Sequence, residues 1–339
     1  MAPKSLDLVA DDYHFLSSQF TKPVALPSDL TLSSSTIIIT GANTGIGYTT
    51  AQKLLSLDLK RLIIAVRSIS KGESATSSLR AQYPKSEILV WEVDMLSYKS
   101  VQDFAEKCKT LGRIDLAILN AGAQFTKFEL GPEGHESSFQ INYLSTILLA
   151  TLLLPTLKEK APRGQAGRLT IVNSGTSLTA EFPNANDDEV LAFYDDKKNF
   201  SEGLNPMPSY AKHKALAHFW IYKLYERVSP KDVIVNLVDP GLVRNTSLQQ
   251  QGNIAIQYVG AVMKWFVARS LEQGADTLVQ AGVVMGEESH GCYVMDWRIH
   301  HFTKFLHTKE GQAFAGKVWD ETYEELPVDV DGILKACFN

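Results

Sequence analysis

The stretch "TIIITGANTGIG", Thr36 to Gly47, decides the fold of this chain. Its first five residues form an apolar, β-branched run typical of a buried strand, and a helix-like segment follows the glycines. Glycines at such a turn permit close approach of the backbone to a pyrophosphate at the N-terminus of the helix. An ordinary strand-to-helix turn is the alternative interpretation. The residues expected to contact a nucleotide are Gly41, Asn43, Thr44, Gly45, Ile46 and Gly47.

Similar apolar runs recur along the chain with helix-length segments between them. They span 36–40, 61–66, 87–93, 114–120, 168–174, 233–239 and 292–296. Strands that are apolar throughout and alternate with helices are typical of a parallel sheet covered on both faces. The sequence therefore predicts an α/β fold with a doubly wound parallel sheet of about seven strands, in the order 3-2-1-4-5-6-7. Ligands are expected at the carboxyl ends of the strands.

The composition and charge limit the kinds of molecule that the chain is expected to bind. The chain has 339 residues, of which 45% are apolar and 21% charged, so it can bury a large core. The net charge is −5 and no long basic run is present, which argues against nucleic acid as a partner. The three cysteines are far apart and lack the spacing of a metal site. A small molecule is the expected partner, with no metal.

The sequence also predicts a cytoplasmic protein without an integral membrane segment. The N-terminus lacks the apolar core of a secretory signal. The longest apolar run, Leu144 to Pro155, is shorter than the roughly 20 residues that span a bilayer, so a buried helix explains it better.

Three segments do not fit the regular alternation of strands and helices. We expect an N-terminal arm over 1–35, an insertion over 178–208 and a lid candidate over 249–270. The part of the lid candidate at 254–268 is interpreted as lid or core, with a membrane-surface helix as the alternative. The main domain is expected over 36–300, and the helical tail 301–339 should pack on the same domain.

The end of the second apolar run favours NADP(H) over NAD(H). An NAD-binding protein usually has an acid there for the ribose 2′-hydroxyl, but this chain has Arg67 in "AVRSISK". A guanidinium can bind a 2′-phosphate through two parallel hydrogen bonds, and Ser68 or Lys71 could add to this site. The alternative is a solvated arginine at a strand end.

Further polar residues follow the next two strands. Asp94 and Met95 end the third strand, in position to meet an adenine ring, and "NAG", Asn120, Ala121 and Gly122, ends the fourth. Each could be ordinary turn chemistry. Together they occupy successive strand ends on the ligand-binding edge of the predicted sheet, which favours a nucleotide site.

The candidate catalytic pair lies in "SYAKHK", where Tyr210 and Lys214 share one face of a predicted helix. An ammonium beside a phenol favours the phenolate, and so is expected to lower the pKa of Tyr210 toward the range of a general acid or base. The spacing alone is weak evidence. Ser174, at the end of the fifth strand, could orient a substrate carbonyl, and Asn142 could act through water toward the lysine.

Taken in order, these motifs resemble the short-chain dehydrogenase/reductase family, which has a Rossmann-type fold. The resemblance covers about residues 35–300 and is carried by "TGANTGIG", "NAG", Asn142, Ser174, the YxxxK pair and "DPGLV" (Asp239 to Val243). "AVRSISKGE" and the C-terminal "VWDETYEEL" resemble the retinol-dehydrogenase-like branch and fungal relatives, many of which act in secondary metabolism.

The resemblance implies a role for each matching position. Tyr210 gives or takes the substrate proton and Ser174 orients the carbonyl. Lys214 holds the nicotinamide ribose and lowers the Tyr210 pKa, while Asn142 keeps a water in the proton relay. Gly241, Val243 and Thr246 would contact the cofactor, although Asn245 stands where the family usually has threonine. A long insertion separates Ser174 from Tyr210, and Ser177 is a rival hydroxyl.

The predicted function is an NADP(H)-dependent oxidoreductase that interconverts a ketone or aldehyde and an alcohol on a mostly apolar small molecule. The apolar character rests on "IQYVGAVMKWF" near the expected site. A homodimer is possible. The alternative is a non-redox protein of the same fold, such as a dehydratase, isomerase, cyclase or cofactor-sensing regulator.

Overall fold

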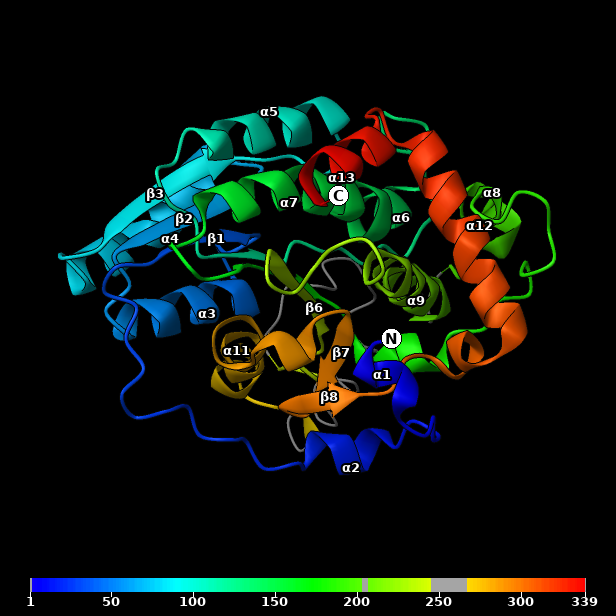
Figure 1. Ribbon diagram of the computed structural model, residues 1–339, viewed down its shortest axis with the longest axis horizontal. Helices are drawn as coiled ribbons and strands as arrows, with labels where there is room; N and C mark the ends of the chain where they lie inside the picture. The colour runs from blue at the N-terminus through cyan, green and yellow to red at the C-terminus, as the bar shows by residue number, and fades with distance from the viewer. Residues whose placement is uncertain (1, 203–206, 245–266, 339) are drawn as a thin grey trace.

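An eight-stranded, mostly parallel sheet runs through the centre of the computed structural model, which describes residues 2–202, 207–244 and 267–338 (Figure 1). The strand order is β3-β2-β1-β4-β5-β6-β7-β8. The strands are β1 (Thr36–Thr40), β2 (Arg61–Val66), β3 (Glu87–Glu92), β4 (Leu116–Leu119), β5 (Gly167–Val172), β6 (Val233–Val238), β7 (Cys292–Met295) and β8 (Arg298–His300). The predicted doubly wound sheet and the order of its first seven strands are confirmed.

The eighth strand is a correction to the predicted count. β8 pairs antiparallel with β7 through a two-residue turn, Asp296 and Trp297, and both residues have positive φ angles (55° and 60°). Hairpin turns of this shape usually carry Asn-Gly or Asp-Gly. The sequence "DW" gives no such signal, so the short edge strand escaped prediction.

Helices cover both faces of the sheet. The helices between and after the strands are α3 (Gly45–Ser56), α4 (Ile69–Gln82), α5 (Tyr98–Lys109), α6 (Ser137–Phe139), α7 (Ser145–Lys160), α9 (Met207–Leu224) and α11 (Leu271–Val279). Successive residues of β1 alternate between two clusters. Ile38 belongs to the cluster that includes residues of α5, α7 and α9, whereas Ile37 and Ile39 belong to the cluster that includes residues of α3, α4 and α11. This alternation is the reason why each central strand is apolar throughout.

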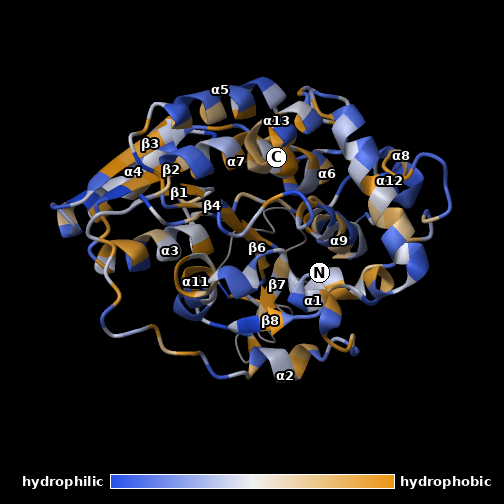
Figure 2. Ribbon diagram, viewed as in Figure 1, coloured by the Kyte–Doolittle hydropathy of each residue, from blue (hydrophilic) through white to orange (hydrophobic). Residues whose placement is uncertain are grey.

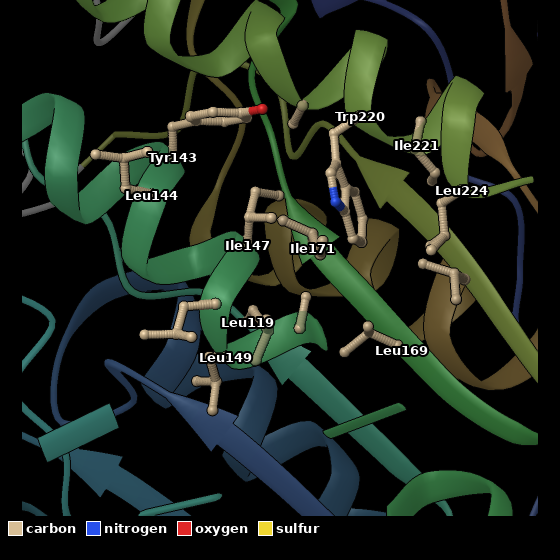
Figure 3. Close-up of a cluster of buried hydrophobic side chains, with 14 of the residues drawn as sticks. Leu119, Tyr143, Leu144, Ile147, Leu149, Leu169, Ile171, Trp220, Ile221 and Leu224 are labelled. Carbon is tan, nitrogen blue, oxygen red and sulfur yellow. The ribbon is translucent and has the colours of Figure 1, made fainter. Parts of the chain in front are cut away.

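The larger cluster lies between the sheet and the helices α7 and α9 (Figure 3). Ile147 and Trp220 come from these two helices and Leu169 and Ile171 from β5, and all four side chains are buried. Unlike the buried cluster, the helices α5 and α12 (Lys309–Glu325) carry hydrophilic as well as hydrophobic residues (Figure 2). The stretch Ser137–Lys160 is long and apolar enough to cross a membrane, but 89% of its most apolar window is buried inside the protein.

The segments outside the alternation form short helices that pack on this core. The arm contains α1 (Lys4–Asp7) and α2 (Phe15–Gln19), and the insertion contains α8 (Ala192–Asp195) and η3 (Lys197–Asn199) and begins at the end of η2 (Gly175–Thr179). The remaining elements are the π-helical turns η1 (Gln140–Leu144) and η4 (Gln280–Val284), the 3-10 turns η5 (Glu287–Ser289) and η6 (Lys304–His307), and α13 (Val330–Phe338). Most of the lid candidate, 245–266, and 203–206 of the insertion lie outside the described residues.

The tail is fastened to the helices of the larger cluster. Trp220 Nε1 on α9 donates to the Tyr323 hydroxyl on α12 at 3.0 Å, and the Arg227 guanidinium lies 4.2 Å from the centre of the Trp319 ring. The helix α13 also packs on α7. The predicted division of the chain into arm, main domain and tail stays a prediction.

A buried histidine joins the insertion to the tail. His135 Nδ1 lies 2.7 Å from Asp195 Oδ2 on α8, and His135 Nε2 lies 2.9 Å from Glu325 Oε1 on α12. Burial by itself would lower the pKa of His135, but the hydrogen bonds and charges of the two carboxylates outweigh it and the pKa is raised. The protonated imidazole is therefore the form that holds these segments together.

This raised pKa predicts a pH-dependent contribution to stability. The contribution is fully present below about pH 6.5, the unfolded pKa, and is lost as the pH rises through the higher folded pKa. We expect His135→Gln to lower the free energy of unfolding by about 1 kcal/mol at pH 6 and by less at pH 8. Urea unfolding at both pH values, with His14→Gln on the exposed arm as control, measures this difference. Equal losses at the two pH values would contradict it.

Candidate active site

The residues at the end of β4 pack closely against the glycine turn after β1. Gly41 has a φ of +66°, a conformation that side chains other than glycine rarely adopt. A Cβ on Gly47 would lie 2.5 Å from Asn120 Nδ2 and 2.8 Å from the Gly41 carbonyl oxygen, so only glycine fits. Thr44 is the N-terminal cap of α3. These features are those of a backbone cradle at a helix N-terminus, as a pyrophosphate requires.

Asn120 braces this cradle. Its Nδ2 donates to Thr40 O at 2.9 Å and to Gly41 O at 3.2 Å. The Thr40 hydroxyl in turn accepts from the backbone N–H groups of Asn120 (3.0 Å) and Ala121 (2.9 Å). Thr40 was not among the predicted site residues, although it is the last residue of the strand that precedes the glycines. The two strand ends therefore form one unit.

The candidate phosphate-binding residues lie at the end of β2. Arg67 and Lys71 are exposed. The Ser68 hydroxyl caps α4 by accepting the backbone N–H of Lys71 at 3.5 Å. Two cationic side chains thus flank a helix N-terminus, where an anion is favoured.

At the end of β3, the Asp94 carboxylate is engaged by its own turn. Asp94 Oδ1 accepts from the Leu96 backbone N–H at 3.0 Å, and the Asp94 backbone N–H donates to the Ser100 hydroxyl at 2.9 Å. Met95 is buried. The turn is therefore rigid and keeps Asp94 half-buried at the same edge of the sheet as Gly41 and Gly122.

Three of the predicted residues meet at the end of β4. A Cβ on Gly122 would lie 3.0 Å from Asn142 Oδ1 and 3.5 Å from Lys214 Nζ. Asn142 lies in η1, and its amide exchanges two hydrogen bonds with the Ala123 backbone, at 2.6 and 3.1 Å. A π-helical turn inside an α-helix often marks a functional site, because it redirects side chains. Sequence patterns do not show such a turn.

The Lys214 ammonium is buried, with 5% of the residue exposed. It donates to the Val172 carbonyl oxygen at the end of β5 at 2.9 Å. An ammonium has three donors, and among the described residues Val172 is the acceptor of one, which leaves two for other acceptors. Burial lowers the pKa of Lys214 to about 8. These properties fit a group that holds two neighbouring ribose hydroxyls.

The Tyr210 phenol lies on the same helix face, with Lys214 Nζ 5.9 Å from the centre of its ring. Burial and then the charge of Asp239 raise the pKa of Tyr210, while the Ser174 hydroxyl acts in the opposite direction. The pKa shift is thus opposite to the predicted lowering by Lys214, and the reason is the desolvation of the phenol together with a carboxylate that sequence reasoning did not consider. The neutral phenol is therefore the favoured form of Tyr210.

Ser174 ends β5 and begins η2. Its hydroxyl lies 2.9 Å from the Thr176 hydroxyl and accepts from the Thr176 backbone N–H at 3.3 Å. The rival Ser177 is fully buried and bonded to His218 Nε2 at 3.1 Å. Because His218 Nδ1 accepts the Thr303 backbone N–H at 3.1 Å, Nε2 carries the proton and donates to Ser177. Ser177 is therefore a structural residue.

The carboxylate of Asp239 is the main site feature missing from the prediction. It follows β6 directly and is 1% exposed, and its Oδ2 has no hydrogen-bond partner among the residues described. Burial raises the pKa of Asp239 to about 6, against the charge of Arg269 and hydrogen bonds from the backbones of Gly241 and Gly175. Asp239 therefore connects Gly175, next to Ser174, with the turn after β6. Asp239 is the first residue of the motif "DPG", so the sequence did indicate its position.

The turn after β6 brings the remaining predicted residues to the same edge. Gly241 has a φ of +78°, and Val243 pairs with Arg269 in an isolated parallel bridge. Thr246 and Asn245 lie outside the described residues. The described residues contain no cluster that could hold a metal ion.

The arrangement of these groups suits a dinucleotide. The cradle at Gly41 and Gly47, the cations near Ser68 and the buried ammonium of Lys214 follow one another along the carboxyl edge of the sheet. They match the phosphates and ribose of such a molecule. The carboxyl ends of β1, β4 and β5 thus carry complementary parts of a single site.

Comparison with known proteins gives the family. Residues 35–185 match the model of the short chain dehydrogenase family. The short chain dehydrogenase/reductase mfmJ of Annulohypoxylon moriforme is 44% identical over 326 residues, which cover 95% of this chain and 94% of that protein. The short chain dehydrogenase virL of Hypocrea virens is 39% identical over 313 residues, 92% of this chain and 91% of that protein.

The fold has solved counterparts as well. L-sorbose reductase from Gluconobacter frateurii, in complex with NADPH and L-sorbose, has a TM-score of 0.59 at 19% identity and covers 79% of this chain and 97% of its own. With the order of the motifs, the strand topology and these relatives in agreement, the chain belongs to the fungal branch of the short-chain dehydrogenase/reductase family of oxidoreductases.

Proposed function

We propose that this protein is an NADP(H)-dependent oxidoreductase that interconverts a carbonyl group and an alcohol on a mostly apolar small molecule. The observation that carries the proposal is the meeting of Gly122, Asn142 and Lys214 at the end of β4, with Tyr210 one helical turn before the lysine. The bound nicotinamide would supply or accept the hydride. The chain itself would bind, orient and move the proton.

The Tyr210 hydroxyl is the proposed general acid in reduction and general base in oxidation. Its raised pKa favours the protonated form, which suits the donation of a proton to a carbonyl oxygen. Ser174 would orient that oxygen by a hydrogen bond, and Lys214 would hold ribose hydroxyls with its free donors. Asn142, held on both sides by the Ala123 backbone, would keep a water between the lysine and solvent.

The preference for NADP(H) rests on Arg67, Ser68 and Lys71. Exposed cations at the end of β2 suit the 2′-phosphate, and no carboxylate stands at Arg67. NADPH is also the cofactor in the complex of L-sorbose reductase. The fungal relatives support a role in secondary metabolism, and a cytoplasmic location and a homodimer belong to the same proposal.

A non-redox activity on this fold is the alternative. Loss of Ser174 or Tyr210 would favour it, and both residues are present at the expected positions. The redox function is therefore the better supported of the two.

The first test removes the proposed proton donor. Tyr210→Phe should lower kcat about 10²- to 10⁴-fold with little effect on NADPH affinity, because only the transferred proton is lost. Consumption of NADPH with a panel of lipophilic ketones and aldehydes measures this, and Tyr222→Phe, a half-buried tyrosine on the same helix, is the control. A kcat of Tyr210→Phe close to that of the wild-type protein would exclude the proposed role.

A second test concerns the choice of cofactor. Arg67→Asp should weaken NADPH binding about 10- to 100-fold and NADH binding much less, because a charge-assisted pair with the 2′-phosphate becomes a repulsion. Fluorescence titration of both reduced cofactors measures this. Arg163→Asp, an exposed arginine at the opposite end of the strands, is the control. An equal loss of affinity for NADPH and NADH would contradict the proposed contact between Arg67 and the 2′-phosphate.

A third test uses the charge of Asp239. Because this charge raises the Tyr210 pKa, Asp239→Asn should lower that pKa and move the acid limb of alcohol oxidation to lower pH. The pH profile of kcat for oxidation, measured at saturating NADP⁺, reports the shift. An unchanged limb, or a limb at higher pH, would show that Asp239 does not act on Tyr210.

A further inference from the structure

The side chain of Asn173 is buried next to the proposed active site, and the proposed reaction does not use it. The residue is 3% exposed. It directly follows β5, and its backbone N–H donates to the Val238 carbonyl oxygen of β6 at 2.7 Å. A buried amide side chain costs free energy unless its polar atoms are hydrogen-bonded. The partners of this amide therefore indicate what it does.

Both polar atoms of the Asn173 side chain bond to residues that have proposed roles in the reaction. Oδ1 accepts the backbone N–H of Ser174 at 2.7 Å, and Nδ2 donates to the backbone carbonyl oxygen of Lys214 at 3.0 Å. These partners fix the orientation of the amide, because an N–H group only donates and a carbonyl oxygen only accepts. One side chain thus joins the strand end that carries Ser174 to the helix that carries Lys214.

The end of β5 holds Lys214 in two ways. The Lys214 ammonium donates to the Val172 carbonyl oxygen at 2.9 Å, and the Lys214 backbone accepts from the next residue, Asn173. Figure 3 shows Ile171 of β5 and Trp220 of α9 in the same buried cluster. Apolar packing has little directional preference, whereas hydrogen bonds have a defined geometry. The polar contacts therefore set how α9 is placed against the strand end.

A second contact joins the turn after β5 to α9. The Ser177 hydroxyl in η2 lies 3.1 Å from His218 Nε2 on α9. The Ser174 hydroxyl, by contrast, is bonded to Thr176 within its own turn. The backbone of Ser174 is linked to α9 through the Asn173 amide. Because the contact at Ser177 and the apolar packing remain without this amide, we expect a variant that lacks it to fold.

We propose that Asn173 is a positioning residue, which sets where Ser174 lies relative to Tyr210 and Lys214. The inference rests on the proposed function, in which the hydroxyls of Ser174 and Tyr210 both bind the oxygen of one carbonyl group. Proton transfer requires heavy atoms about 2.6 to 3.2 Å apart. A misplacement of about 1 Å can lower a rate about 100-fold. Asn173 therefore acts on the reaction through the position of Ser174.

A double-mutant cycle with Ser174→Ala tests this inference. Asn173→Ala should lower kcat about 10- to 100-fold in the otherwise wild-type chain, because the Ser174 hydroxyl leaves its position. In the Ser174→Ala background that hydroxyl is already absent, so the same change should lower kcat by no more than about 2-fold. NADPH consumption with 4-nitrobenzaldehyde measures both values. Equal losses in the two backgrounds would overturn the inference.

Asn236→Ala is the matched control. Asn236 is 1% exposed within β6, and its Nδ2 donates to the Ala281 carbonyl oxygen at 2.9 Å. This variant loses a buried amide of the same kind away from Ser174, so its kcat should stay close to that of the wild-type protein. A loss as large as that in Asn173→Ala would contradict positioning. Asn173→Ser, which keeps a polar atom but is too short to bridge both partners, replaces Asn173→Ala in the cycle if the latter does not fold.

Amide hydrogen exchange gives a readout that needs no turnover. The Ser174 N–H should exchange about 3- to 10-fold faster in Asn173→Ala than in the wild-type protein, the value of one hydrogen bond. The Ile171 N–H within β5 should keep its rate. If the wild-type protein converts no carbonyl compound, the redox proposal fails and the exchange measurement alone decides the inference. An unchanged exchange rate at Ser174 would overturn the inference in either case.

Discussion

The buried ammonium of Lys214 is the constraint on which the site depends. It lies against the sheet, bonded to the Val172 carbonyl oxygen, and close to Gly122 and Asn142. A buried charge is tolerated only when it is paired or hydrogen-bonded, so β5, the end of β4 and η1 must keep their places around it. The π-helical turn at Asn142 and the glycine at 122 are local adaptations to this requirement. A cofactor ribose would complete the hydrogen bonds of the ammonium.

Much of this architecture could be predicted from the sequence, for a physical reason. Central parallel strands are buried on both faces, so runs such as "TIIIT" reveal them, and parallel strand ends bring Gly41, Asn120 and Ser174 to one edge. Contacts between distant segments leave no such pattern. The pairing of Arg269 with Asp296, the position of Tyr13 and the effect of Asp239 on Tyr210 all depend on burial that only the folded chain defines. The β7–β8 turn lacks the usual turn residues.

The tail and the arm have different consequences for the molecule. α12 covers the outer face of α9, and α13 packs on α7, so the tail occupies surfaces of the two helices that carry Tyr210, Lys214 and the largest core cluster. Any dimer must use another face, or this tail. The arm instead reaches the catalytic edge through Ser18 and Tyr13. The tail thus packs on the scaffold helices, and the arm packs beside the segments that follow β5 and β6.

The central claim is that hydride moves between a nicotinamide and a substrate carbon at the Tyr210–Lys214 site. The most direct measurement uses NADPH labelled with deuterium at the transferable position of the nicotinamide and follows the label by mass spectrometry. The account predicts that the label appears on the carbinol carbon of the product, and that Lys214→Ala abolishes this transfer. A product that forms without the label, or a label that stays on the cofactor while the substrate is converted, would contradict it.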